Sequence, residues 1–255
     1  MTSWRTAIAA SDETHIWIRG YDIADLMKKA TFADLVFLLH QKRLPTEKER
    51  GLLDAILIAV ADHGAGAPSC AAARLAASGN RESLSAAVAA GLLAVGTDHG
   101  GAGTACMEMI ATGLAEAASP GGSIEAAARK AVSTAAAAKT LVPGFGHRVH
   151  TTDPRVEVLF GMAKDAGLSG KAVAFMRAAE AALHERGKKV PTNVDGALAA
   201  VLHELGFAPP AGKFIFMIGR VAGLTAEVAE EYEREKPMRI RFDVDYDGVP
   251  PRPIE

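Results

Sequence analysis

The chain has 255 residues with a formal net charge of −2 at pH 7, and 49% of its residues are hydrophobic but only 5% aromatic. Its length supplies a core for one large domain or two modest ones, and its balanced charges, without a basic stripe, exclude nucleic acid as an expected partner. The longest run without a charged residue, Ser83 to Thr97, is 15 residues long, which is too short to span a bilayer as a helix.

The first predicted element is a short strand or hairpin. Residues 14–19 alternate polar and apolar side chains before Gly20, the pattern of a half-buried strand. Beyond it, alanine-rich apolar periodicity interrupted by glycines and prolines predicts closely packed helices. These helices are expected at about residues 22–29, 31–40, 46–61, 68–79, 82–96, 102–118, 123–140, 153–166, 169–186, 193–206 and 213–234.

The last segment, residues 239–255, differs from the rest. From Ile240 to Tyr246 apolar residues alternate with charged ones, and a glycine and three prolines follow. This pattern predicts an extended arm outside the core. Such an arm either packs on a partner subunit or remains a solvated tail, and the sequence leaves both interpretations open.

Two features bear on the cellular compartment. Residues Met1 to Arg5 lack the apolar segment of a signal peptide. The only cysteines are Cys70 and Cys106, which are expected to be reduced thiols in the core rather than a disulfide framework. We therefore expect a cytoplasmic protein.

The most informative stretch runs from Leu141 to Arg155. His147 follows two glycines in the sequence G-F-G-H, and Arg155 follows an Asp-Pro helix start. Glycines let the backbone approach a ligand closely, and an arginine can hold a carboxylate in a fork. The pattern favours a site for a carboxylated substrate, although a loop with a surface histidine would also fit.

Other polar residues stand at helix ends beside glycines, and we expect them to converge with His147 on one cleft. They are His63, His99 in D-H-G-G, and Asp195 in P-T-N-V-D, while Arg220 follows an apolar helical run. Helix ends tune the protonation of nearby side chains. Each residue also has a structural interpretation: His63 and Asp195 as helix caps, and Arg220 as a surface side chain whose stem covers apolar residues.

A metal or nucleotide-phosphate site is not expected. His147 and His150 form an H-x-x-H pair, but the further ligands of a structural zinc site are not arranged nearby. Glycines at a helix start are suited to binding phosphate. Residues 100–103 nevertheless match neither the Rossmann nor the P-loop pattern.

Together these motifs resemble the citrate synthase superfamily, and most closely its short citryl-CoA lyase members. Several family motifs occur in the same order, and the resemblance covers most of the chain. The matching segments are R-G-Y-D-I-A-D-L at 19–26, Leu38-Leu39 and L-P-T at 44–46, D-H-G-G-A at 98–102, P-G-F-G-H-R-V at 143–149 with D-P-R at 153–155, and P-T-N-V-D at 191–195.

The resemblance implies a fold and an assembly. The expected fold is all-α and citrate synthase-like, with a short N-terminal β-hairpin. Residues 1–120 and 207–255 would form a large helical domain for dimerisation, and residues 121–206 a smaller mobile domain that binds CoA. An obligate homodimer or a higher homo-oligomer is expected.

The resemblance also assigns three catalytic roles. Asp195 would take a proton from the acetyl methyl group, or return it in the cleavage direction. His99 would donate a hydrogen bond to the thioester oxygen of the enol or enolate. His147 would polarise the carbonyl of a 2-oxoacid and, in reverse, accept the proton of the tertiary hydroxyl.

Binding roles are implied for two further groups of residues. His63, Arg155 and Arg220 would hold the carboxylates of the substrate, and the basic residue lent by the partner subunit would be Lys236 or Arg239. The residues expected to contact CoA are Leu141, Val142, Pro143, Gly144, Phe145, Gly146, Lys188 and Asn193.

Departures from the family pattern favour a lyase-type member, or one with an altered substrate, over a housekeeping synthase. The chain is much shorter than a full citrate synthase, and the spacing from His147 to Arg155 is one residue shorter than usual. We therefore predict cleavage of citryl-CoA to acetyl-CoA and oxaloacetate, with a CoA thioester as substrate and no tightly bound cofactor. A separate ligase would supply citryl-CoA. The alternatives are a synthase that condenses an acyl-CoA with oxaloacetate or a related 2-oxoacid, and a non-catalytic CoA-binding subunit.

Overall fold

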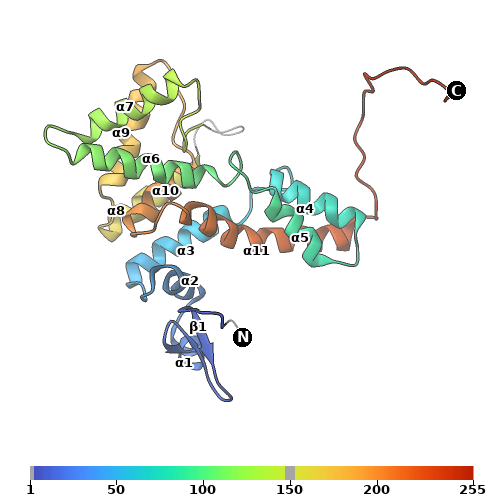
Figure 1. Ribbon diagram of the computed structural model, residues 1–255, viewed down its shortest axis with the longest axis horizontal. Helices are drawn as coiled ribbons and strands as arrows, with labels where there is room; N and C mark the ends of the chain where they lie inside the picture. Colours follow the sequence, from blue (N-terminus) through green and yellow to red (C-terminus); the bar gives the residue numbers. More distant parts are fainter. Residues whose placement is uncertain (1–2, 147–152, 255) are drawn as a thin grey trace.

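The computed structural model describes residues 3–146 and 153–254. Within them the fold is helical, with eleven α-helices and one small sheet (Figure 1). The sheet has three antiparallel strands in the order β1 (Ala9–Ser11), β2 (Ile16–Ile18) and β3 (Tyr21–Asp22). The expected hairpin is confirmed and has an additional strand before it. Among the described residues no helix is both long and apolar enough to cross a membrane.

The helices agree with the prediction to within a few residues. They are α1 (Ile23–Lys29), α2 (Phe32–Gln41), α3 (Glu47–Ala61), α4 (Pro68–Gly79), α5 (Leu84–Leu93), α6 (Ala102–Ala117), α7 (Ile124–Ala137), α8 (Pro154–Ala166), α9 (Lys171–Glu185), α10 (Val194–Glu204) and α11 (Ala211–Arg234). Helix α5 ends before its predicted end because Gly96 forms β-bridges with residues 99 and 100. Helix α7 ends early because Lys139 has a left-handed backbone, with φ of 55°.

Side chains that cap the N-termini explain where several helices begin. Asp22, Thr31, Thr46 and Asn193 each accept a hydrogen bond from a backbone N–H two or three residues ahead. At α3 the cap is reciprocal, because the Glu49 carboxylate also accepts from the Thr46 N–H at 2.7 Å. These contacts satisfy N–H groups that have no partner inside the helix.

Glu49 also forms an ion pair whose effect on stability depends on pH. Arg43 donates two hydrogen bonds to its carboxylate, at 3.0 and 2.6 Å. The Arg43 hydrogen bonds, with those from Thr46, outweigh burial and lower the pKa of Glu49 to about 2. Because the folded pKa is depressed, the pair stabilises the fold above the unfolded pKa of roughly 4.3. That stabilisation is lost as the pH falls towards 2.

We expect Glu49→Gln to lower the free energy of unfolding at pH 7 by about 1 kcal/mol, since glutamine keeps the cap but loses the ion pair with a half-exposed arginine. The difference from the wild type should shrink at about pH 3, where the wild-type advantage is being lost. Urea denaturation at both pH values measures it. Glu47→Gln is the matched control, because Glu47 lies in the same turn with its side chain 87% exposed. An equal difference at both pH values would contradict the explanation.

The helices pack around two groups of buried residues, and α11 joins them. The larger group includes Phe37, Ile110, Phe175 and Leu198, from α2, α6, α9 and α10. The smaller lies among α4, α5 and the C-terminal half of α11 (Figure 1). The larger group draws on both predicted domains, so the division at residues 120 and 206 remains a prediction.

Glycines bring α11 very close to the end of α3. A Cβ at Gly219 would lie 2.7 Å from the carbonyl oxygen of Leu57, and one at Gly223 would collide with the carbonyl of Ala61. Larger side chains would therefore push the two helices apart. Arg220 lies between these two glycines, so the close approach presses it against α3.

The C-terminal segment extends away from the body as predicted (Figure 1). Residues 239–254 contain no helix or strand, and Phe242 and Val244 are exposed. The start of the segment is held against α4, because the Met238 N–H donates a hydrogen bond to the Ser78 carbonyl at 2.9 Å. The structure confirms an extended arm, and its packing on a partner subunit remains a prediction.

Candidate active site

His99 lies in a tight turn between α5 and α6. Gly96 forms β-bridges with both His99 and Gly100, and Gly100 has a φ of 74° that favours glycine. Phe216 packs so closely on Gly100 that a Cβ there would collide with its ring. The same phenyl ring meets the imidazole edge-on, with centroids 5.8 Å apart. The turn and the ring together fix the position of the imidazole.

Ser69 determines which nitrogen of His99 carries the proton. The Ser69 backbone N–H donates to His99 Nε2 at 3.3 Å, and the Ser69 hydroxyl lies 2.9 Å from the same nitrogen. A backbone N–H can only donate, so Nε2 is an acceptor and the proton of the neutral ring is on Nδ1. This N–H belongs to the first turn of α4, where it has no partner inside the helix.

Arg220 is buried and bonded, with only 2% of its surface exposed. Its Nε donates to the Val60 carbonyl at 2.8 Å, and one Nη donates to the Ser69 hydroxyl at 3.2 Å. The guanidinium also stacks on Phe216, 4.9 Å from the ring centre. Ser69 therefore links Arg220 to His99. The surface interpretation of Arg220 is wrong, because α3 and α11 approach too closely to leave it in solvent.

The turn at Gly144–Gly146 is built against the turn that begins α10. The Asn193 backbone N–H donates to the Gly144 carbonyl at 3.0 Å, and the Asn193 side-chain amide donates to the Gly146 carbonyl at 2.7 Å. Gly144 and Gly146 have φ values of 84° and 82°. These conformations suit glycine and open the backbone to a ligand. Two of the predicted motifs thus form one structural unit.

Asp195 follows in the first turn of α10, and Asn193, not Asp195, caps that helix. Its Oδ1 atom is buried and has no hydrogen-bond partner among the described residues. Burial raises the pKa of Asp195; the charges of Arg155 and Arg220 oppose the shift and that of Asp153 adds to it. A buried carboxyl group with a raised pKa is suited to proton transfer.

Arg155 lies beside Asp195 at the start of α8. Its Nε and Nη2 donate to Asp153 at 2.9 and 2.8 Å, and its Nη1 donates to the Ala59 carbonyl at 3.0 Å. Among the described residues, two further N–H groups of the guanidinium have no partner and can bind a ligand. Burial acts to raise the pKa of Asp153, but the hydrogen bonds and charge of Arg155 outweigh it and the pKa is lowered.

Cys106 on α6 packs beneath both turns. Its Sγ would lie 2.7 Å from a Cβ at Gly144, and it contacts the Met176 sulfur at 3.6 Å. Complete burial, and then the charge of Asp195, raises the pKa of this thiol. Cys106 is therefore a neutral, apolar floor under the site. The expectation that Cys70 and Cys106 are unpaired core thiols is confirmed.

The remaining predicted residues lie nearer to solvent. His63 is exposed after the end of α3, and Leu141 has 91% of its surface exposed. Val142 and Pro143 are half-buried, while Lys188 is exposed beyond α9. His147 lies outside the described residues, so its predicted place beside Gly146 is untested.

The two basic residues predicted to reach a partner's site lie past the end of α11. Lys236 is exposed. Arg239 pairs with the buried Glu231 at 2.6 Å and with Glu235 at 3.0 Å. Within one chain the structure does not bring either residue to His99 or Asp195.

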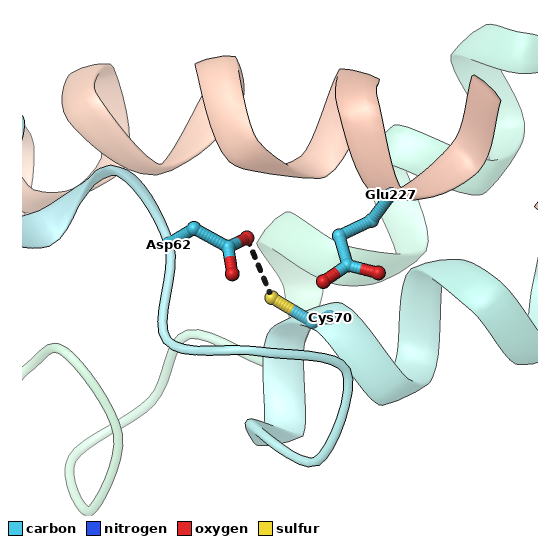
Figure 2. Close-up of side chains that lie close together, drawn as sticks. All are labelled: Asp62, Cys70 and Glu227. Atoms are coloured by element: carbon cyan, nitrogen blue, oxygen red, sulfur yellow. Dashed lines mark hydrogen bonds between the residues drawn. The ribbon is translucent and has the colours of Figure 1, made fainter. Parts of the chain in front are cut away.

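A second cluster lies behind the site, where Asp62, Cys70 and Glu227 place their donor atoms within 4.8 Å of one another (Figure 2). The Cys70 thiol donates to Asp62 at 3.4 Å, and burial, followed by the charge of Asp62, raises its pKa. Glu227 is paired with Arg74 at 2.6 Å. The raised pKa favours the protonated thiol, which donates the hydrogen bond to Asp62. The Cys70–Asp62 hydrogen bond therefore joins α4 to the end of α3. The Arg74–Glu227 ion pair joins α4 to α11.

Three residues that support the site had no predicted role: Ser69, Asp153 and Cys106. Local signals existed for two of them. Ser69 follows Pro68 at a helix start, and Asp153 precedes Pro154 as an N-cap. Those signals indicate helix ends but not the distant partners of the side chains, so the functional contacts were missed.

The sequence and the fold are both similar to those of known proteins. The family described as "Citrate synthase, C-terminal domain" matches residues 46–241. The fold is similar to that of citryl-CoA lyase from Hydrogenobacter thermophilus, with a TM-score of 0.89, 39% identity, and coverage of 99% of this chain and 97% of that one. ATP citrate lyase from Methanothrix soehngenii, solved with citrate and coenzyme A, has the same fold at 18% identity and a TM-score of 0.77, covering 97% of this chain and 42% of that chain.

Curated relatives include synthases that are longer than this chain. 2-Methylcitrate synthase of Shewanella oneidensis is 32% identical over 227 residues, 87% of this chain and 56% of the relative. Citrate synthase 2 of Bacillus subtilis is 33% identical over 150 residues, 57% of this chain and 37% of the relative. The aligned region thus spans about a third to just over half of these relatives. The family match, the shared fold and the order of the motifs show that the chain belongs to the citrate synthase family.

Proposed function

We propose that the protein is a citryl-CoA lyase, which cleaves citryl-CoA to acetyl-CoA and oxaloacetate through an enol or enolate. The observation that carries the proposal is the similarity to a citryl-CoA lyase along almost the whole of both chains. The site supports it, because the charges of Arg155 and Arg220 act on the carboxyl group of Asp195. Ser69 also links Arg220 to the imidazole of His99. The substrate is a CoA thioester that carries carboxylates, and no tightly bound cofactor enters the proposal.

In cleavage, the tertiary hydroxyl of citryl-CoA loses its proton while the bond to the methylene carbon next to the thioester breaks. The electron pair of that bond passes into the thioester and forms the enolate. The hydroxyl carbon becomes the keto carbon of oxaloacetate. We assign the proton acceptor to His147 on its place in the G-F-G-H motif alone.

His99 stabilises the enolate oxygen. With Nε2 held by Ser69, the proton of the neutral ring is on Nδ1, from which it can be donated to the thioester oxygen. A donor fixed in advance at the point where negative charge develops lowers the barrier by several kcal/mol, of order 3. The neighbouring Arg220 is buried and positively charged, and its charge also favours the negative enolate oxygen.

Asp195 completes the reaction by giving its proton to the enol carbon, which becomes the methyl group of acetyl-CoA. Its raised pKa favours the protonated form that this step requires. In the opposite direction the carboxylate removes a methyl proton. Arg155 and Arg220 hold the carboxylates of oxaloacetate, and the turn of residues 141–146 with Lys188 and Asn193 receives CoA.

We expect Ser69→Ala to lower kcat for cleavage by about 10-fold, because one hydrogen bond that orients His99 is lost. The affinity for free CoA, which does not involve Arg220, should change little, since the turn of residues 144–146 is untouched. Ser78→Ala is the matched control. Ser78 is a buried serine on the same helix whose hydroxyl has no partner among the described residues. Equal kcat values for the two variants would contradict the role given to Ser69.

The proposal is tested with purified protein and citryl-CoA. A lyase releases oxaloacetate and acetyl-CoA in equal amounts, without free citrate or free CoA. Asp195→Asn, purified in the same way, controls for a contaminating enzyme. Release of citrate and CoA instead, or no reaction at all, would overturn the proposal.

A synthase is the second candidate, favoured by the similarity to 2-methylcitrate synthase over 87% of this chain. Such an enzyme would condense acetyl-CoA or propionyl-CoA with oxaloacetate and hydrolyse the product thioester. A thiol reagent would then report steady release of free CoA. Faster release of free CoA from propionyl-CoA than from acetyl-CoA would identify a 2-methylcitrate synthase. A lyase is expected to release free CoA from neither thioester.

We propose further that the enzyme is a cytoplasmic homodimer and receives citryl-CoA from a separate ligase. The exposed apolar side chains of the arm, and two free thiols, support a partner subunit and a reducing compartment. In the dimer, Lys236 or Arg239 would approach the site of the other subunit. Light scattering at micromolar concentration tests the assembly, and a monomer would contradict it.

A further inference from the structure

One buried carboxylate joins the N-termini of two helices at the site. Asp153 caps α8, and its Oδ1 accepts from the N–H of Arg155 at 3.1 Å and from its Nε at 2.9 Å. Its Oδ2 accepts from Arg155 Nη2 at 2.8 Å and from the N–H of Val194 at 3.1 Å. The carboxylate is completely buried. All four hydrogen bonds therefore form without competition from water, and each is charge-assisted.

These bonds set the spacing between two parts of the proposed machinery. Val194 is the first residue of α10 and directly precedes Asp195. Arg155 is held from the other side by the Ala59 carbonyl of α3. Asp153 thus fixes the guanidinium and the first turn of α10 to one another, although 41 residues separate it from Val194.

The charge of Asp153 also acts on Asp195. Among the described residues, the charged groups that act on Asp195 are Arg155 in α8, its N-cap Asp153, and Arg220 in α11. The Cys106 thiol approaches from α6. Both arginines lower the pKa of Asp195, while Asp153 raises it. Without Asp153, the charge of Arg155 would be unneutralised and would favour the ionised form of Asp195 more strongly.

We propose that Asp153 is a positioning residue of the reaction: it holds the Arg155 guanidinium for a substrate carboxylate and holds Asp195 at a fixed place beside it. This inference rests on the proposed function. Asp153 touches neither CoA nor the carbons that react, and it acts through Arg155 and Asp195.

The test is Asp153→Asn, followed by exchange of the acetyl-CoA methyl hydrogens for deuterium in the presence of oxaloacetate. Asparagine caps helices as well as aspartate and keeps one acceptor oxygen, so the variant removes the charge with little change in shape. Exchange in this direction needs the ionised form of Asp195. The matched control is Asp34→Asn, because Asp34 is another buried carboxylate in the first turn of a helix, near Arg50.

We expect Asp153→Asn to raise KM for oxaloacetate by about 10-fold or more, as charge-assisted hydrogen bonds to Arg155 are weakened. The acid limb of the pH profile for exchange should move to lower pH, by about half a unit or more, because the charge that raised the pKa of Asp195 is gone. Asp34→Asn should leave both values unchanged.

Unchanged KM and an unchanged acid limb in Asp153→Asn would overturn the inference. Failure of Asp153→Asn to fold, with Asp34→Asn still folded, would also overturn it, because the carboxylate would then serve folding rather than positioning. If the wild type neither cleaves citryl-CoA nor exchanges methyl hydrogens, the proposed function itself fails. The wild-type assay therefore separates the two failures.

Discussion

Asp195→Asn is expected to lower kcat for citryl-CoA cleavage by about 10³-fold, because an amide cannot give a proton to the enol carbon. The same change should make the protein more stable at pH 7. The pKa of Asp195 is raised in the folded state by burial, so the ionised carboxylate destabilises the fold above its unfolded pKa of about 3.9. Asparagine removes that cost and keeps the shape.

Turnover of citryl-CoA and urea denaturation at pH 7 measure the two effects together. The stability gain should vanish below about pH 4, where both forms of the protein are neutral at this position. Asp165→Asn, at an exposed position on α8, controls for the loss of one negative charge. Retained activity in Asp195→Asn would contradict the proton-transfer role. Reduced activity with reduced stability would instead indicate a structural carboxylate.

Gly144→Ala is expected to lower the free energy of unfolding by about 3 kcal/mol and to abolish CoA binding. An alanine at this position would destabilise the fold in two ways. The φ of 84° at Gly144 is strained for any residue with a Cβ. The added Cβ would also lie 2.7 Å from Cys106 Sγ and 2.8 Å from the Gly196 Cα. Backbone at the start of α10 must shift, and Asp195 shifts with it.

Gly146→Ala separates the two costs, because Gly146 has nearly the same φ of 82° but, among the residues that the structure describes, no atom lies within 4 Å of a Cβ built there. Gly146→Ala should lower the free energy of unfolding only by the cost of this backbone strain, about 1 kcal/mol. Chemical denaturation gives both values, and calorimetric titration with CoA gives the affinity. Equal losses of stability in the two variants would show that packing between Gly144, Cys106 and Gly196 is unimportant.

Local sequence signals predicted most of the fold. Apolar periodicity with glycine and proline breaks located each helix that the structure describes, because these signals act within one or two turns. Thr31 and Thr46 marked helix starts through reciprocal caps. The ends of α5 and α7 were less accurate, since the bridges of Gly96 and the left-handed backbone of Lys139 depend on how the chain turns after each helix.

The candidate site was only partly predictable. Resemblance to a family predicted catalytic roles for His99, His147 and Asp195, but not the contacts that orient them. Ser69 is 30 residues from His99, and Asp153 is 41 residues from Val194. Such pairs form only when helices distant in sequence pack together, so no local sequence pattern predicts them. The burial of Arg220 has the same origin, because it results from two glycines on α11 meeting the end of α3.

The central claim is that His99 and Asp195 act on one thioester. Its most direct test is a crystal structure of the protein with oxaloacetate and carboxymethyl-coenzyme A, an analogue of the enol of acetyl-CoA. The carboxymethyl group should lie between His99 Nδ1 and the Asp195 carboxyl, within about 2.7–3.1 Å of each. An analogue bound away from either side chain, with both pointing elsewhere, would contradict the account.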